Sequence, residues 1–301
     1  MNTSVNIGSL KPRNPIMNAS GTFGLDEYDK YIDFSKIGAL VAKSVTRNPK
    51  QGNRPPRIVE VDSGVLNCVG LQNTGVLDFV ENKIPKLRKI DTNIIVSISN
   101  HSVEDFKASA QMLDKVDGAA GYEINVSCPN VEEGGKTFGQ SSEQTYNVVR
   151  TVRDIIKAPI IVKLTPNVTD IVPIAKAAVE AGADGLTVAN TYIGMAVDLD
   201  TKKPVLGNII GGLSGAAVKP LTLRLVYNIH KALDIPIVAS GGVYTAGDAL
   251  EYLLVGATAV QVGTANFIKP DIMTDIVEGI KKFMIEKNIE DINDFIGSLI
   301  K

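Results

Sequence analysis

The sequence predicts a (β/α)8 barrel with long loops at the ends of several strands. Eight short apolar runs rich in β-branched residues recur along the 301 residues, and helical patterns separate most of them. Most of these runs are continuous rather than alternating, as in parallel strands that are covered on both faces. No Gly-x-Gly-x-x-Gly turn follows the first run, which disfavours a doubly wound open sheet, the alternative fold class.

The eight apolar runs are the expected strands of the barrel. In chain order they cover residues 15–20, 39–46, 93–99, 122–127, 160–165, 185–190, 236–241 and 259–263. Parallel barrel strands present their carboxyl ends at one face, where barrel proteins carry their chemistry. We therefore expect the residues that end these runs to meet in one site.

The segments between the strands predict helices and three long loops. Helices are expected over residues 75–89, 102–115, 169–182, 245–254 and 270–287, with another that begins at Ser141 or Ser142. Ser102 suits an N-cap, because Glu104 and Asp105 follow it in the first turn. The long loops cover residues 47–64, 129–140 and 191–214, and loops of that length are usually functional. No linker divides the chain, so residues 1–301 are expected to form a single domain.

The composition excludes several classes of protein. With 31 basic and 33 acidic residues the formal net charge is −2, so no basic surface for nucleic acid is indicated. No apolar run approaches the roughly 18 residues of a membrane span, and the N-terminus lacks the pattern of a signal peptide. Two cysteines, Cys68 and Cys128, are too few for a disulfide framework or a four-thiolate iron–sulfur cluster, so we expect a reduced cytoplasmic protein. No cluster of histidines and carboxylates indicates a metal site.

Glycines end the last two expected strands. Ser240-Gly241-Gly242 follows the seventh strand and Gly263-Thr264 follows the eighth, where backbone N–H groups of a barrel often bind a phosphate. The segment Gly211-Gly212-Leu213-Ser214-Gly215 would add further N–H donors. Tight turns, which glycine also serves, are the alternative.

Two lysines interrupt apolar runs. Lys163 lies within the fifth run and Lys43 within the second. A buried lysine is costly unless it pairs with an anion or has a function. Three roles are open for each: a Schiff base with a carbonyl substrate, a positive charge beside an anionic cofactor ring, or a structural ion pair.

Amide side chains gather near the expected strand ends. Asn67, Asn125 and Asn190 each offer two donors and an acceptor, which suits a planar ring with carbonyl and N–H groups. Cys128, just past the fourth run, has the chemistry of a base or a nucleophile, and a packed small residue is the alternative. A Cys–His hydrolase would need His101, because His230 is expected on a helix surface. The strand ends carry two lysines and no carboxylate, which favours an anionic ligand.

Taken together, these segments resemble one family, the dihydroorotate dehydrogenases. The matching pieces follow the family's order along nearly the whole chain, at residues 18–24, 43–46, 67–73, 125–130, 190–195, 211–215, 240–242 and 263–264. The resemblance implies an FMN-dependent (β/α)8 barrel that oxidises (S)-dihydroorotate to orotate in pyrimidine biosynthesis, with one FMN per chain.

Position 128 and the loop after it imply a class within that family. Class 1 members use cysteine as the base where class 2 members use serine, and this chain has Cys128. The segment Val131-Glu132-Glu133-Gly134-Gly135 resembles class 1B, the NAD-linked form. Its catalytic chain pairs with an electron-transfer subunit that carries FAD and a [2Fe–2S] cluster, usually in a heterotetramer built on a dimer of the catalytic chain. Class 1A, a fumarate-linked homodimer, is the alternative, and a Schiff-base lyase is a more remote one.

The resemblance also assigns site residues. The catalytic pair would be Cys128, the base that takes the proton from substrate C5, and Lys163, the charge that stabilises the reduced flavin. FMN contacts are implied for Ser20, Lys43, Ser44, Asn125, Lys163, Ala189, Gly215, Gly241, Gly242, Gly263 and Thr264, and for Ser97, where the family usually has asparagine. Substrate contacts are implied for Lys43, Asn67, Cys68, Val69, Gly70, Leu71, Asn125, Asn130, Asn190 and Thr191.

Overall fold

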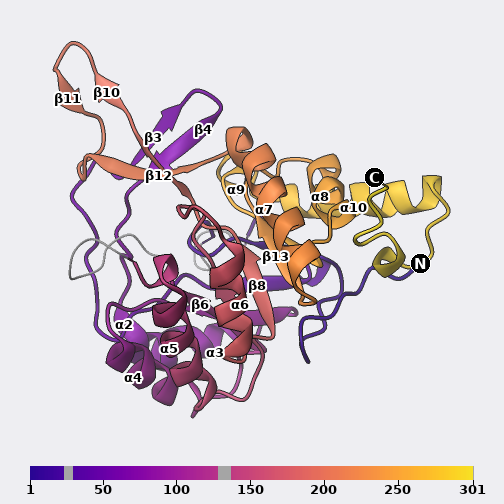
Figure 1. The fold of residues 1–301 in the computed structure, drawn as a ribbon, viewed down its shortest axis with the longest axis horizontal. Coiled ribbons are helices and arrows are strands. Elements are labelled where there is room, and N and C mark those ends of the chain that lie inside the picture. The colour runs from indigo at the N-terminus through magenta and orange to yellow at the C-terminus, as the bar shows by residue number, and fades with distance from the viewer. Residues whose placement is uncertain (24–29, 128–136, 301) are drawn as a thin grey trace.

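The computed structural model describes residues 1–23, 30–127 and 137–300, and its centre is a closed barrel of eight parallel strands (Figure 1). Each strand pairs with the barrel strands before and after it in the sequence, and β14 closes the ring on β1. Every expected run overlaps one barrel strand, so the predicted fold class is confirmed. The strands are β1 (Ile16–Asn18), β2 (Ala39–Val41), β5 (Asn93–Ile98), β6 (Gly121–Asn125), β7 (Ile160–Lys163), β8 (Gly185–Val188), β13 (Ile237–Ser240) and β14 (Ala259–Val262).

The strands end earlier than the apolar runs that predicted them. Strand β2 stops at Val41 instead of Thr46, although Val45 still forms a single bridge to Ile98 of β5. Between these two points Lys43 and Ser44 leave the ladder. The carboxyl ends of the runs are therefore irregular backbone, which lets their polar side chains turn toward the barrel mouth.

Helices surround the barrel, and most of them lie where the sequence predicts a helix. These are α4 (Val103–Leu113), α5 (Ser142–Arg153), α6 (Val172–Glu180), α8 (Ala246–Leu254) and α10 (Ile272–Glu286), with a short α9 (Ala265–Ile268) after β14. Ser102, Ser141 and Thr245 cap α4, α5 and α8 by accepting a hydrogen bond from a backbone N–H in the first turn. In the part of the chain that the structure describes, no helix is long and apolar enough to cross a membrane.

The expected helix over residues 75–89 is confirmed over residues 75–87, but it contains a π-helical turn that the sequence did not predict. It divides into α2 (Gly75–Asp78), a π-helical segment (Phe79–Lys83) and α3 (Ile84–Leu87). Pro85 stands at the start of α3 and has no N–H, so the regular α-helical hydrogen bond back to Glu81 cannot form. The wider π-turn just before it accommodates this missing bond.

One helix of the barrel was not among the expected ones. Helix α7 (Lys219–Ala232) connects the segment 191–214 to β13 and buries Thr222, Leu225, Val226 and Ile229. These four positions follow helical spacing, so the pattern was present in the sequence. His230 lies exposed on this helix, as expected.

A second sheet stands above the carboxyl ends of the barrel. Four antiparallel strands, in the order β3 (Ile58–Val61), β4 (Gly64–Asn67), β12 (Ile210–Ser214) and β9 (Tyr192–Met195), project from the barrel together with a hairpin of β10 (Val197–Asp198) and β11 (Lys203–Pro204) (Figure 1). Asn67 pairs with Gly212, and Leu66, Cys68 and Leu206 form a small separate core. Two of the three stretches predicted as loops, 47–64 and 191–214, thus contribute strands to one sheet, and predicting them as loops was wrong.

Candidate active site

The barrel mouth and the antiparallel sheet enclose a cavity of about 320 Å³. Val65, Ile193 and Leu213 of the sheet line its far side. Most of the residues predicted from the sequence line this cavity: Ser20, Lys43, Ser44, Asn67, Cys68, Val69, Gly70, Leu71, Asn125, Lys163, Ala189, Asn190, Thr191, Gly241, Gly242, Gly263 and Thr264. The strand ends therefore meet in one place, as expected from the barrel geometry.

Two predicted residues, Ser97 and Gly215, lie outside the cavity lining. Ser97 is fully buried behind it, with its hydroxyl 2.8 Å from that of Ser44. Gly215 has a φ of +114°, and a Cβ there would come within 2.5 Å of the Cα of Gly64. The glycine at 215 thus permits the chain that leaves β12 to pass close to the start of β4, which is a structural reason for its presence.

Lys163 lies at the floor of the cavity in a buried polar network. Its ammonium Nζ is 3.3 Å from Gln261 Oε1 and 3.9 Å from Glu123 Oε1, and all three side chains are at most 5% exposed. Lysine and carboxylate compensate each other's charge in this water-poor interior. The structural ion pair, one of the three roles that the sequence allowed for Lys163, is therefore present. The lysine also lines the cavity.

Lys43 has a different environment from Lys163. The sequence placed both lysines inside apolar runs, but Lys43 is exposed and lies at the cavity rim. The chain leaves the β2 ladder just before it, so the side chain does not point into the barrel core. The expectation that Lys43 is a buried lysine was wrong, whereas Lys163 fulfils it.

The amide groups form a connected arrangement on one side of the cavity. Asn125 Oδ1 accepts hydrogen bonds from the backbone N–H and the hydroxyl of Ser127, at 3.1 and 2.7 Å. Asn190 donates to Ser127 Oγ at 2.7 Å and accepts from the backbone N–H of Thr191. Because its oxygen accepts these two hydrogen bonds, the NH2 group of Asn125 is the part of its amide that could donate to a carbonyl oxygen.

The loop after β4 contributes backbone as well as side chains. Gly70 and Leu71 both have positive φ, +75° and +55°, and a Cβ on Gly70 would come within 2.7 Å of Asn53. Asn67 donates to the carbonyl of Gly212 and so joins this loop to β12. Cys68 is 7% exposed, and its thiol lies 3.6 Å from the carbonyl of Pro56, which supports the packed-residue interpretation for this cysteine.

Packing within the chain accounts for two of the glycines at the barrel mouth. A Cβ on Gly241 would meet Thr222 Oγ1 at 2.8 Å, and one on Gly242 would meet Lys219 at 2.8 Å. Both glycines also have positive φ. The tight-turn interpretation is therefore sufficient at these two positions, and they are no independent sign of a phosphate.

Some of the expected site residues are not part of the described cavity. Cys128 and Asn130, with most of the loop 129–140, lie outside the described residues. His101 is half-buried and is absent from the described cavity lining, so nothing described connects it to a nucleophile. The residues that the structure describes contain no group of three or more histidines, cysteines and carboxylates able to hold a metal ion.

The chain is similar to known proteins along almost its whole length. The family model for dihydroorotate dehydrogenase matches residues 2–284. The chain belongs to the dihydroorotate dehydrogenase family. It is 49% identical over 300 residues to a protein of Thermoanaerobacter pseudethanolicus, with 99% of both chains covered, and 49% identical over 299 residues to one of Desulforamulus reducens, covering 99% of this chain and 98% of the relative. A protein of Geotalea uraniireducens is 48% identical over 298 residues. All three relatives are named dihydroorotate dehydrogenase B (NAD(+)), catalytic subunit.

Membership of the dihydroorotate dehydrogenase family confirms the resemblance stated from the sequence motifs. The sequence did not, however, single out several polar residues of the site. Glu123, Thr187 and Gln261 lie within barrel strands at alternating positions and point inward, where they bond to one another. Their signal was a polar residue in the interior of each apolar run, which a search limited to strand ends passes over.

Proposed function

We propose that this protein is the catalytic subunit of an NAD-linked dihydroorotate dehydrogenase, which oxidises (S)-dihydroorotate to orotate with FMN as its bound cofactor. The observation that carries the proposal is the buried Lys163 ammonium at the floor of a cavity walled by amide side chains, in a chain of this family. This arrangement suits a planar, electron-accepting ring that gains negative charge on reduction.

Gly263 provides a test of whether the cavity fits the cofactor. Unlike Gly241 and Gly242, it has no positive φ, and among the described residues a Cβ there would meet only Ala19 at 3.4 Å and Thr22 at 3.7 Å, which are ordinary contacts. The packing of the described residues therefore does not require glycine at 263. A ligand group that approaches the backbone at the end of β14 does require it, as the phosphate of FMN would.

The residues of this chain have distinct roles in the proposed reaction. Bound FMN supplies the hydride acceptor. Lys163 holds a positive charge at the cavity floor, where negative charge develops during reduction. Cys128 takes the proton from C5 of the substrate as the general base, a role carried over from the family resemblance.

The cavity walls orient the substrate. Asn125 presents its NH2 group, and Asn67 and Asn190 add amide groups from the sheet loop and from the end of β8. Lys43 at the rim supplies a positive charge for the carboxylate of the substrate. Exclusion of water from the cavity strengthens each of these interactions.

We further propose a partner subunit that carries FAD and a [2Fe–2S] cluster, in a heterotetramer built on a dimer of this chain. The chain has two cysteines, too few for four thiolate ligands. Exposed apolar side chains on and beside the antiparallel sheet favour assembly through this face: Ile58, Ile193, Met195, Val197, Leu199, Ile209 and Ile210. Light scattering tests this assembly by comparing the molar mass of Leu199→Asp with that of the parent protein. An unchanged molar mass in the variant would exclude this face from the assembly. A cytoplasmic location stays a prediction.

An anaerobic titration with dihydroorotate tests the reaction itself. The purified chain is expected to be yellow and to lose its visible flavin absorbance as dihydroorotate is added. Reoxidation by NAD in the presence of the partner subunit, and not by fumarate, would separate the NAD-linked class from the fumarate-linked one. A yellow protein that keeps its colour would refute dihydroorotate as the substrate. Borohydride trapping of a lysine adduct would favour a Schiff-base lyase instead.

A further inference from the structure

Glu123 is a buried carboxylate that the proposed reaction does not use. It lies in the middle of β6, is 1% exposed, and is absent from the described cavity lining. Three neutral groups donate hydrogen bonds to it: Gln261 Nε2 at 2.8 Å, Thr187 Oγ1 at 3.1 Å and Ser97 Oγ at 3.2 Å. These donors come from three other barrel strands, so the carboxylate is held in place from several sides.

The hydrogen bonds of Glu123 fix the orientation of the amide beside Lys163. Gln261 gives an N–H to Glu123 Oε2, and its oxygen therefore faces the ammonium of Lys163 at 3.3 Å. The direct separation between Lys163 Nζ and Glu123 Oε1 is longer, 3.9 Å. Glu123 thus acts on the lysine in two ways, through the amide and through its own charge.

The same carboxylate also sets the direction of a row of hydroxyl groups. The hydroxyl group of Ser97 donates its only hydrogen to Glu123. In the 2.8 Å contact between the hydroxyl groups of Ser44 and Ser97, the donor is therefore Ser44. Ser44 has then no hydrogen left for Ser20, 3.2 Å away. The oxygen atoms of Ser44 and Ser20 therefore serve as acceptors at the cavity wall.

We propose that Glu123 is a positioning residue that fixes the Lys163 ammonium at the floor of the cavity and moderates the positive charge that a bound flavin would experience. This inference rests on the proposed FMN site. A lysine and a carboxylate at the cavity floor have no net charge together. Without the carboxylate the positive charge is uncompensated, and the negatively charged reduced flavin gains stability relative to the oxidised form.

Four proteins test this role: the parent, Glu123→Gln, Lys163→Gln and the double variant. Each is loaded with FMN, and its two-electron reduction potential is measured under identical buffer conditions. The flavin affinity is measured by fluorescence in parallel. Asp184→Asn is the matched control, because Asp184 forms another carboxylate–cation pair of the same barrel, with Arg153 at 2.9 Å, near the amino ends of the strands.

The expected order of potentials is Glu123→Gln highest, then the parent and the double variant, then Lys163→Gln. Glu123→Gln should shift the reduction equilibrium at least about tenfold toward reduced flavin, which corresponds to about 30 mV. Asp184→Asn should leave the potential unchanged. An unchanged or lower potential in Glu123→Gln would overturn the proposal, because a purely structural carboxylate would alter only stability.

The double variant keeps the test decisive if Glu123→Gln does not fold. It contains no unpaired buried charge, and its potential should exceed that of Lys163→Gln by a similar factor. Equal potentials in these two proteins would overturn the proposal. A parent protein that binds no FMN would instead refute the proposed function, so the two failures are distinguishable.

Discussion

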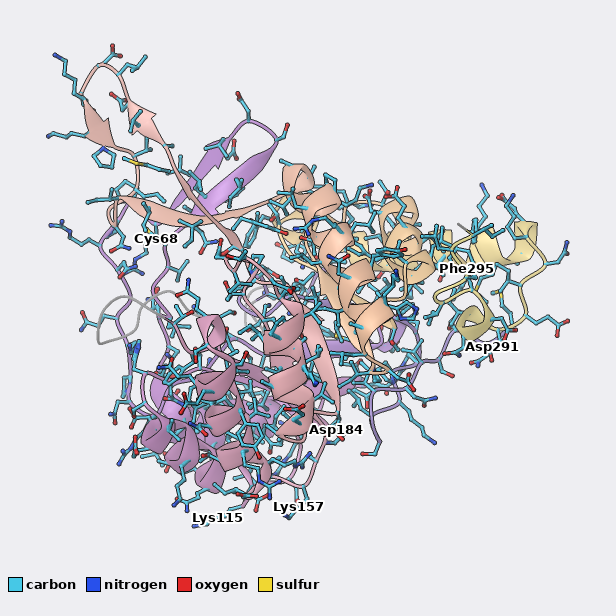
Figure 2. All side chains as sticks on the ribbon, in the orientation of Figure 1. Cys68, Lys115, Lys157, Asp184, Asp291 and Phe295 are labelled. Carbon is cyan, nitrogen blue, oxygen red and sulfur yellow. The ribbon has the colours of Figure 1, made fainter. Side chains whose placement is uncertain are left out.

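The two ends of the barrel contain similar ion pairs with different surroundings. At the carboxyl ends of the strands, Lys163 and Glu123 lie 3.9 Å apart beneath the cavity, and neutral donors hold the carboxylate. Near the amino ends, Arg153 and Asp184 lie 2.9 Å apart, and Asp184 also accepts the backbone N–H of Ile160 at 2.8 Å. Figure 2 shows Cys68 beside the antiparallel sheet at the upper left and Asp184 in the lower part of the view, away from that sheet. The first pair leaves the lysine available to a ligand, and the second ties helix α5 to β7 and β8.

This difference indicates a division between chemistry at one end and stability at the other, as in barrels generally. Variants of side chains that face the cavity should act chiefly on cofactor and substrate chemistry. Variants at the amino ends should act chiefly on unfolding. Each prediction below tests one part of this division.

The largest effect is expected for Cys128→Ala. Loss of the general base should slow flavin reduction by dihydroorotate by about 10² or more. Stopped-flow absorbance measures this rate, and the free energy of unfolding should change little. Cys128→Ser, which keeps a weaker base, should retain more activity than the alanine variant. If the flavin in Cys128→Ala were reduced at the same rate as in the parent protein, Cys128 could not be the general base.

Asp184→Ala should affect stability instead. It leaves Arg153 without its carboxylate and removes the acceptor for Ile160 N–H, so a loss of about 2 kcal/mol in the free energy of unfolding is expected. Urea denaturation of the FMN-loaded protein measures it. Asp184→Asn, which keeps an acceptor oxygen, should lose less. A change in the rate of flavin reduction would contradict the division between the two ends.

The glycines at the barrel mouth allow a sharper test within the functional end. Gly263→Ala should leave the unfolding of the FMN-free protein within about 0.5 kcal/mol of the parent, because the added Cβ makes ordinary contacts. Its FMN affinity should fall about tenfold, or about 1.4 kcal/mol, if a ligand occupies this space. Gly242→Ala is the comparison, since it should destabilise the fold through its positive φ and its contact with Lys219. An unchanged FMN affinity in Gly263→Ala would exclude the ligand from this position.

The sequence predicts the barrel well because its evidence is local. Each strand is a short apolar run, and caps such as Ser102 and Thr245 are visible in the residues that follow them. The antiparallel sheet is different, since β4 pairs with β12 across a long separation in the chain. Its strands are short and half-exposed, and their pairing depends on contacts that no local pattern contains.

The candidate site divides in the same way. Asn125 and Lys163 are predictable, because polar residues at the ends of apolar runs are conspicuous. The dependence of Lys163 on Glu123 and Gln261 is not, since these side chains meet only when β6, β7 and β14 close into one barrel. The exposure of Lys43 likewise follows from where β2 ends, which the apolar run of residues 39–46 does not reveal.

The smallest effect is expected at a third ion pair, which lies at the functional end but outside the cavity. Lys219 at the start of α7 contacts Asp248 of α8 at 2.6 Å, with the two side chains 24% and 16% exposed. Burial alone would raise the pKa of Asp248, but hydrogen bonds from Lys219, Tyr244 and Thr245 outweigh it and lower the pKa below its ordinary value. A carboxyl with a lowered pKa stabilises the folded state above its unfolded pKa of about 3.9, and loses this contribution as the pH falls through the folded value.

Asp248→Asn should therefore cost about 1 kcal/mol at pH 7, a modest value because the pair is partly exposed to solvent. The difference from the parent should shrink once the pH falls below about 4 and vanish in stronger acid, as protonation removes the same charge from the parent. Urea unfolding from pH 7 to pH 3 measures this. The flavin potential should stay constant, because neither side chain is part of the described cavity lining. A shifted potential in Asp248→Asn would show that an ion pair near the carboxyl ends influences the flavin even when it does not face the cavity. The position of Lys163 in the cavity would then not explain its effect.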